Sequence, residues 1–207
     1  MLENYFIKGI LIGLIFGIPA GVIGALTIKR TLSHGAFAGL ASGLGCSAAD
    51  LLYSCVSIFG LTLVSDFLLK YQNIISIAGG VLIIISGLGI ILKKQESVSE
   101  NTDASRIVSF FASSFIIAIT NPATILTFML AFSVFEVETV KTAGQGIRLA
   151  AGIFSGACLW WFFIVAVVRL FKKHMTDDRQ KIINRILGAL IIIFGIVIMI
   201  KAVIGLL

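Results

Sequence analysis

Residues 118–128, AITNPATILTF, place a proline in the middle of an apolar run that is long enough to cross a membrane. That run, residues 107–135, contains no charged side chain. The only other proline, Pro19, lies in GIPAGVIG (residues 17–24), in the middle of a second charge-free run. Both prolines of the chain therefore fall near the centre of predicted membrane-spanning segments.

Composition favours a membrane protein over a soluble one. The 207 residues are 58% hydrophobic and 13% charged, whereas a soluble domain carries about a quarter charged residues. A helix of about 20 residues, rising about 1.5 Å per residue, crosses the hydrocarbon layer. Four charge-free runs have that length, and two further segments carry only one or two charges. The six segments are residues 9–28, 35–62, 71–92, 107–135, 149–168 and 183–207. We predict an all-α polytopic membrane protein with six transmembrane helices.

The distribution of Lys and Arg predicts the orientation. Eleven of the sixteen lie in the connections after the first, third and fifth segments, and five lie elsewhere. The positive-inside rule places these odd connections in the cytoplasm and both termini outside a multi-pass plasma-membrane protein. The first run is too long for a signal peptide and is flanked by one acid and one base, so we expect it to be retained. The net charge of +6 then reflects topology, and no nucleic-acid partner is expected.

One polar stretch divides the chain. Residues 93–106, KKQESVSENTDASR, have no apolar periodicity and predict a flexible cytoplasmic linker. The halves on either side, residues 1–92 and 107–207, hold three predicted segments each, and each has its proline in its first segment. Because three is odd, the second half enters the membrane in the opposite orientation. We therefore predict an inverted repeat.

The prolines suggest a substrate site. A proline lacks the N–H and its ring clashes with the carbonyl four residues earlier, so Pro19 frees the carbonyl of Ile15 and Pro122 frees that of Ala118. Freed backbone groups inside a membrane must face protein or a wet cavity. The restarted helices would direct N–H groups at that cavity and bind a carboxylate. Asn121 adds amide donors and an acceptor. The alternative is a pair of ordinary proline kinks.

Asp50 is the only acid in the interior of a predicted segment. It shares a helix face with Gly39 and Gly43, which points it towards the bundle. Intramembrane carboxylates are expensive and mark proton relays, cation sites or partners of a substrate ammonium. We predict that Asp50 is the coupling residue. The alternative is a structural acid that bonds to neighbouring hydroxyls such as Ser47 or Ser54.

Trp160 is the remaining candidate for the substrate site. It lies on the same face as Gly152 and Gly156, a small-residue stripe that favours close helix packing. It can serve either as packing or as a cavity wall.

The sequence holds no metal-ligand cluster, phosphate loop or catalytic triad, so we predict no metal, no cofactor and no enzymatic activity. The three cysteines are interpreted as packing residues, and a thiol–disulfide carrier would need two of them beside the prolines.

Three stretches resemble the LysE/RhtB family of amino-acid exporters. They are GIPAGVIGALTIKRTLSHGAFAGLASGLGCSAADLLYS (residues 17–54), AITNPATILTF (118–128) and CLWWFFIVAV (158–167). The resemblance implies a six-helix inner-membrane exporter of amino acids or related small molecules. Pro19, Asp50, Asn121 and Pro122 match the family's motif positions. Family members usually carry a polar amide after the first proline, where this chain has Ala20, Gly21 and Val22.

The sequence thus predicts a secondary active exporter driven by a proton or monovalent cation, with the lipid bilayer and a small-molecule substrate as partners. The substrate ammonium would use Asp50 or the freed carbonyls, and its carboxylate the restarted helices. A dibasic substrate would call for a second buried acid, so a neutral amino acid is expected. The alternative is a cation or metal-ion exporter, because carboxylate and carbonyl oxygens bind hard ions. A homo-oligomer is compatible with the sequence.

Overall fold

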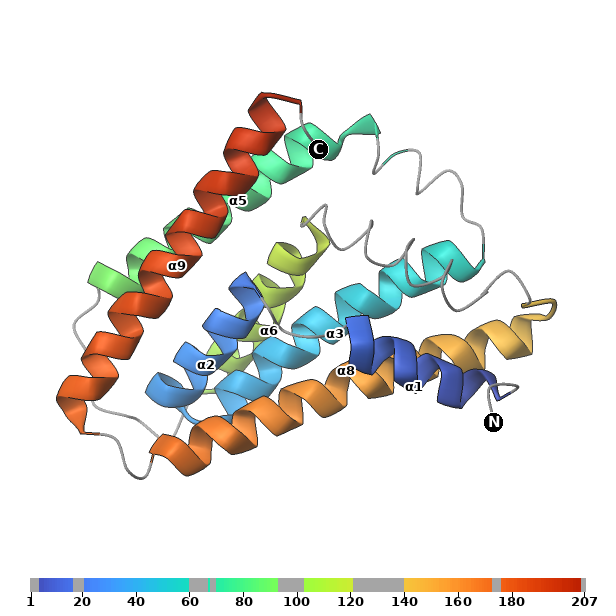
Figure 1. The fold of residues 1–207 in the computed structure, drawn as a ribbon, viewed down its shortest axis with the longest axis horizontal. Helices are drawn as coiled ribbons and strands as arrows, with labels where there is room; N and C mark the ends of the chain where they lie inside the picture. The colour runs from blue at the N-terminus through green and yellow to red at the C-terminus, as the bar shows by residue number, and fades with distance from the viewer. Residues whose placement is uncertain are drawn as a thin grey trace.

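The computed structural model describes residues 4–16, 21–59, 67, 70–92, 103–120, 140–172 and 176–205. Over these residues the chain is helical, without strands, as Figure 1 shows. The helices are α1 (Tyr5–Phe16), α2 (Val22–His34), α3 (Ala36–Ile58), α5 (Gln72–Leu92), α6 (Ala104–Ile119), α8 (Ala143–Lys172) and α9 (Asp177–Val203). The predicted all-α class is confirmed.

Four of these helices are long and apolar enough to cross a membrane. They cover Ala36–Ile58, Gln72–Leu92, Ala143–Lys172 and Lys181–Val203. Two shorter apolar helices, Tyr5–Ile15 and Ala104–Ile119, belong to the segments in which the prolines occur. A multi-pass membrane protein follows from these helices, because each long one exceeds the length needed to span the hydrocarbon layer.

Helices end near both predicted breaks. α1 ends at Phe16 and α2 begins at Val22, on either side of Pro19, while α6 ends at Ile119, just before Asn121 and Pro122. The three predicted residues Pro19, Asn121 and Pro122 themselves lie outside the described residues.

Two predicted connectors are more helical than expected. α6 begins at Ala104, inside the predicted linker 93–106. α8 continues to Lys172 and α9 begins at Asp177, so much of the predicted connection between the fifth and sixth segments, residues 169–182, is helix. Polar and charged residues at helix ends blur these boundaries, because hydropathy marks where the apolar core stops and not where the backbone bonds stop.

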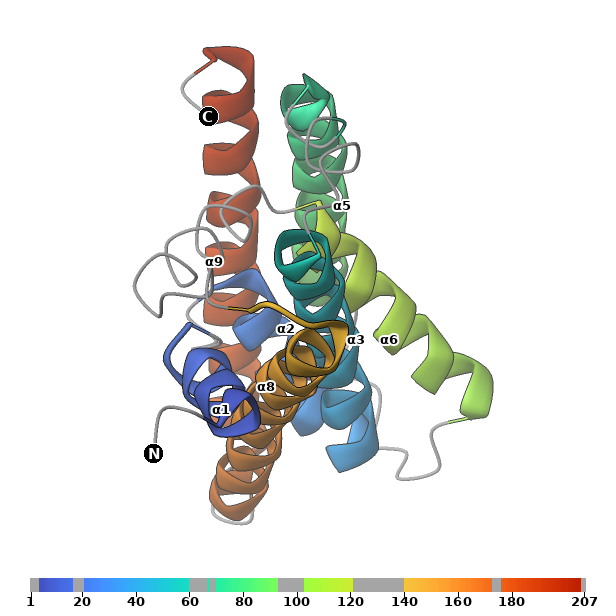
Figure 2. The ribbon, with the colours of Figure 1, turned by 90° about the vertical axis from the view of Figure 1, so that its right-hand side faces the viewer.

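Most of the close helix contacts join a helix of residues 1–92 to a helix of the later part of the chain. α1 packs against α8, α3 packs against both α6 and α8, and α5 packs against α9. Figures 1 and 2 both show α5 and α9 running side by side. One buried cluster joins α1, α3 and α8 through Ile12, Tyr53, Leu149 and Ile153. A second joins α2, α5, α6 and α9 through residues that include Leu26, Ile83, Ile117 and Ile191.

Glycines allow α1 and α8 to approach closely. A Cβ built on Gly9 would overlap the carbonyl oxygen of Leu149, and one built on Gly13 would overlap that of Ile153. From the other side, a Cβ on Gly152 would overlap the backbone of α1. The predicted packing role of the stripe at Gly152 and Gly156 is confirmed, and its partner face on α1 carries Gly9 and Gly13.

Candidate functional site

Asp50 lies on α3 and is buried, with 8% of its surface exposed. Its carboxylate has one hydrogen-bond contact among the described residues, from the Cys46 thiol at 4.0 Å. The Ser54 hydroxyl donates to the backbone carbonyl of Asp50 at 2.7 Å and does not reach the carboxylate. In the part of the chain that the structure describes, no base forms an ion pair with Asp50. The hydroxyl-bonded structural acid that was the alternative is therefore not seen at Ser54.

The face that carries Asp50 points at α8, as the glycine spacing predicts. A Cβ added at Gly43 would overlap the Trp161 side chain, and one added at Gly39 would press on Val165, both on α8. Asp50 follows Gly43 by seven residues, about two helix turns, so it lies on the same face of α3. The buried carboxylate thus sits in the bundle interior, at the α3–α8 contact.

The ends of α1 and α6 are both bonded by aromatic side chains from other helices. The Trp160 indole Nε1 on α8 donates to the carbonyl of Leu14 at 2.5 Å. The Tyr53 hydroxyl on α3 donates to the carbonyl of Ile119 at 2.5 Å. The last four carbonyls of a helix have no partner within that helix, and an unsatisfied carbonyl costs several kcal/mol in hydrocarbon. These two side chains therefore satisfy backbone groups at the two helix ends nearest the prolines.

The predicted substrate-site residues fall at these two ends. Ile15 lies in the last turn of α1, next to the carbonyl that Trp160 bonds, and its side chain is half exposed. Ala118 is buried in the last turn of α6, next to the carbonyl that Tyr53 bonds. Tyr53 follows Asp50 by three residues on α3, so one helix turn carries both the buried acid and the contact to α6. Tyr53 was not among the predicted site residues, although its spacing from Asp50 places both side chains on one helix face.

Arg30 is a further residue whose position the sequence did not predict. We counted it as a base in a cytoplasmic connection, but it lies on α2 with 8% of its surface exposed. Its Nη1 donates to Ser42 and Ser114 at 2.8 Å and to the carbonyl of Phe110 at 3.0 Å. Its Nη2 donates to Ser113 at 2.8 Å.

The guanidinium of Arg30 thus ties α2 to α3 and α6 through neutral oxygens. It also lies over the Phe110 ring, 4.8 Å from the centroid. Among the described residues no carboxylate pairs with it. Because arginine has five donors in a planar fork, it can bridge three helices at once. The paired serines at 113 and 114, followed by the apolar stretch of residues 115–119, were the available signal in the sequence.

Metal-ligand clusters are not found among the described residues: no group of three or more His, Cys, Asp or Glu side chains lies together there. The chemistry that the described site offers is therefore that of one buried carboxylate, two bonded helix ends and a buried guanidinium.

A model of the LysE type translocator family matches residues 14–202, nearly the whole chain. The chain belongs to the LysE type translocator family. The resemblance of the proline, aspartate and tryptophan stretches is thereby confirmed, and the family places this LysE type translocator among membrane transporters and not among enzymes.

Relatives of this LysE type translocator are distant but cover most of its length. "Putative amino acid efflux protein YcgF" of Bacillus subtilis (strain 168) is 24% identical over 198 residues, 93% of each chain. "Uncharacterized membrane protein YahN" of Escherichia coli (strain K12) is 26% identical over 178 residues, 83% of this chain and 78% of the relative. No solved structure shows significant similarity.

Proposed function

We propose that this LysE type translocator exports amino acids or closely related small molecules in exchange for a proton or a monovalent cation. The observation that carries the proposal is Asp50, a buried carboxylate without a basic partner among the described residues. One relative, which aligns over 93% of its length with this chain, is named a putative amino acid efflux protein. A neutral amino acid remains the expected substrate, since one buried acid can neutralise one ammonium.

The exchange of substrate for a proton would follow from the need to neutralise the buried carboxylate of Asp50. A lone carboxylate is costly in the bundle interior, so its charge must be neutralised by a bound proton, a cation or a substrate ammonium. These ligands compete for the same oxygens. Binding of the proton from outside would release the ammonium of the substrate, and binding of substrate from the cytoplasm would release the proton. One carboxylate that changes partner would therefore link uphill export to proton entry.

The substrate carboxylate would lie at the restarted helices after Pro19 and Pro122, with Asn121 as an additional donor. Tyr53 and Trp160 support this arrangement, because they satisfy carbonyls at the ends of α6 and α1 that would otherwise be unpaired. A broken helix end with its carbonyls bonded can border a wet cavity without unpaired backbone.

We also propose that residues 1–92 and 107–207 are inverted halves. The main contacts of these helices correspond when α1, α3 and α5 are exchanged for α6, α8 and α9: α1 packs on α8 as α6 packs on α3, and α5 packs on α9. In each half the first helix ends at an aromatic donor from the second predicted membrane segment of the other half: Trp160 of α8 for α1 and Tyr53 of α3 for α6. Residues 93–106 would join the halves on the cytoplasmic side, with both termini outside.

An export assay tests the proposed function. Cells that do or do not express the protein are loaded with amino-acid dipeptides, and released amino acids are measured outside. Selective release of one amino acid by the expressing cells is expected. Purified protein in vesicles is then loaded with that amino acid to exclude an indirect effect. Release of metal ions without any amino acid would overturn the proposal in favour of a cation exporter.

A further inference from the structure

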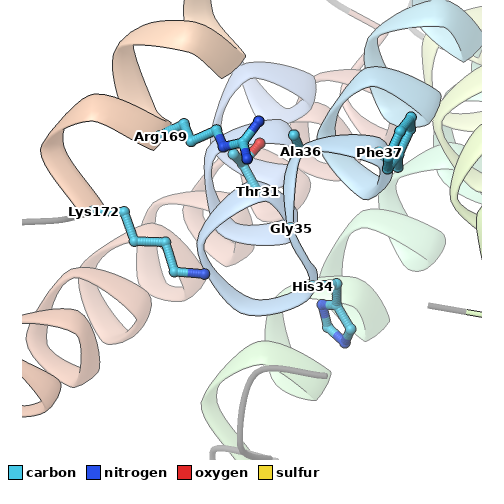
Figure 3. Close-up of a pocket in the computed structure, with 7 residues that line it drawn as sticks. All are labelled: Thr31, His34, Gly35, Ala36, Phe37, Arg169 and Lys172. Carbon is cyan, nitrogen blue, oxygen red and sulfur yellow. The ribbon is translucent and has the colours of Figure 1, made fainter. Parts of the chain in front are cut away.

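A basic pocket lies where the turn between α2 and α3 meets the end of α8. Its volume is about 460 Å³, and its lining includes Thr31, His34, Arg169 and Lys172. Figure 3 shows Arg169 and Lys172 extending from α8 towards the α2–α3 turn at Gly35. None of the described residues that line this pocket is acidic. The pocket is therefore suited to an anion.

An apolar groove adjoins the basic pocket. It has a volume of about 440 Å³ and shares Ala36 and Arg169 with the pocket. Its other lining residues come from α3 and α8 and are apolar: Leu40, Phe162, Val165, Ala166 and Leu170. Phe162 and Leu170 are more than half exposed, so the groove opens to the surroundings of the bundle and not to its interior.

The basic pocket and the apolar groove follow one another along α8. Lys172 and Arg169 lie at the helix end, Val165 and Ala166 lie one turn further along, and Phe162 lies two turns from Arg169. From Arg169 to Phe162 the groove extends roughly 10 Å along the helix axis, at about 1.5 Å per residue. A ligand that fits both features has an anionic head and an apolar tail.

We propose that the pocket and groove bind an anionic glycerophospholipid, with its phosphate at Arg169 and Lys172 and an acyl chain in the groove. The charge is complementary, because the predicted topology puts both the α2–α3 turn and the end of α8 on the cytoplasmic side, where the leaflet is anionic. Arg169 can bind phosphate oxygens in a bidentate manner. This site is separate from Asp50 and does not depend on the exported substrate.

Binding of phosphatidylglycerol to the delipidated full chain in neutral detergent tests the proposal, with native mass spectrometry as the readout. Each base near an anionic headgroup contributes roughly fivefold in affinity, so Arg169→Gln/Lys172→Gln should weaken binding about twenty-fivefold. The matched control is Arg179→Gln/Arg185→Gln, which removes the same charge from exposed positions on α9. It should leave binding within about twofold of wild type.

A second variant tests the groove without changing charge. Ala166→Phe should fill the groove and weaken phosphatidylglycerol binding while the two bases remain. Phosphatidylcholine should bind far more weakly than phosphatidylglycerol, and inorganic phosphate or glycerol phosphate should not displace the lipid. Three results would overturn the proposal: equal binding of phosphatidylcholine, equal weakening by the α9 control, or displacement by inorganic phosphate, which would make the pocket a site for a soluble anion.

Discussion

The indole nitrogen of Trp160 donates a hydrogen bond to the carbonyl of Leu14, a residue 146 positions earlier in the chain. The contact joins the middle of α8 to the last turn of α1. Tyr53 makes the corresponding contact from α3 to the last residue of α6. Both ends of helices next to the prolines are thus held by the opposite half of the chain, and the proposed substrate site depends on these two bonds.

Tyr53→Phe should lower the free energy of unfolding by about 1–2 kcal/mol, because it leaves the carbonyl of Ile119 without its donor. Tyr71→Phe is the matched control, since Tyr71 is 37% exposed and removal of its hydroxyl should have little effect. Thermal unfolding of both variants in nanodiscs measures the difference. Equal small effects at the two tyrosines would show that the bond to Ile119 contributes nothing.

Gly13→Ala should separate α1 from α8, because the new Cβ would overlap the carbonyl of Ile153. We expect a loss of about 1–3 kcal/mol, the cost typical of overpacking a close contact. Gly89→Ala is the control, since nothing lies within 4 Å of a Cβ at that position on α5. Thermal unfolding of each purified variant provides the test, and a Gly13 variant as stable as the Gly89 variant would contradict the packing described.

Ser114→Ala should destabilise the junction of α2, α3 and α6 by about 1–3 kcal/mol, because it removes one acceptor from the buried guanidinium of Arg30. Ser155→Ala is the control: Ser155 is only partly buried, and its hydroxyl donates to the Ala151 carbonyl of its own helix. Effects that do not involve the guanidinium would appear in both variants. If the two serine variants unfold at the same temperature, the bridge from Arg30 has no energetic role.

Single cysteines should report the proposed topology. In a background with all three native cysteines replaced, Ser99→Cys lies in the predicted cytoplasmic linker and Lys141→Cys in a connection predicted to lie outside. A membrane-impermeant maleimide added to intact cells should label residue 141 and not residue 99. Labelling of residue 99 should appear only after permeabilisation. The reverse pattern would invert the topology and place the basic pocket in the outer leaflet.

Much of the fold could be predicted because membrane helices have a strong local signal. Charge-free runs located α5 and α8, and the two apolar segments with one or two charges located α3 and α9. The four-residue spacing of Gly152 and Gly156 identified the face of α8 that packs on α1. The inward direction of Asp50 followed from its spacing to Gly43. Each of these properties is set within one helix, where the period of 3.6 residues fixes the faces.

Properties that depend on several helices were not predicted. Arg30 is buried because Ser42, Ser113 and Ser114 come from two other helices to meet it. In a hydropathy profile, a base such as Arg30 indicates only that a membrane helix ends nearby. Tyr53 was missed for the same reason, since its partner at Ile119 lies 66 positions away. Local sequence patterns carry no information on contacts of that kind.

We propose that Asp50 couples substrate export to entry of a proton or cation, and transport by reconstituted variants tests this directly. Wild-type protein, Asp50→Asn and Pro122→Ala are reconstituted in vesicles loaded with the amino acid identified by the export assay. Two rates are then measured for each: release driven by an imposed proton gradient, and substrate exchange without a gradient. Asparagine keeps the size and hydrogen-bonding capacity of Asp50 but cannot titrate.

We expect Asp50→Asn to abolish gradient-driven release, because the coupling proton then has no carrier. Exchange should be weakened but still measurable at high substrate concentration, because the amide oxygen can accept a hydrogen bond from the ammonium and the helix breaks proposed to bind the substrate carboxylate are intact. Pro122→Ala should abolish release and exchange together, because it restores the helix and closes the proposed carboxylate site. Gradient-driven release at the wild-type rate in Asp50→Asn, with only a lowered unfolding temperature, would show that Asp50 is structural and would contradict the claim.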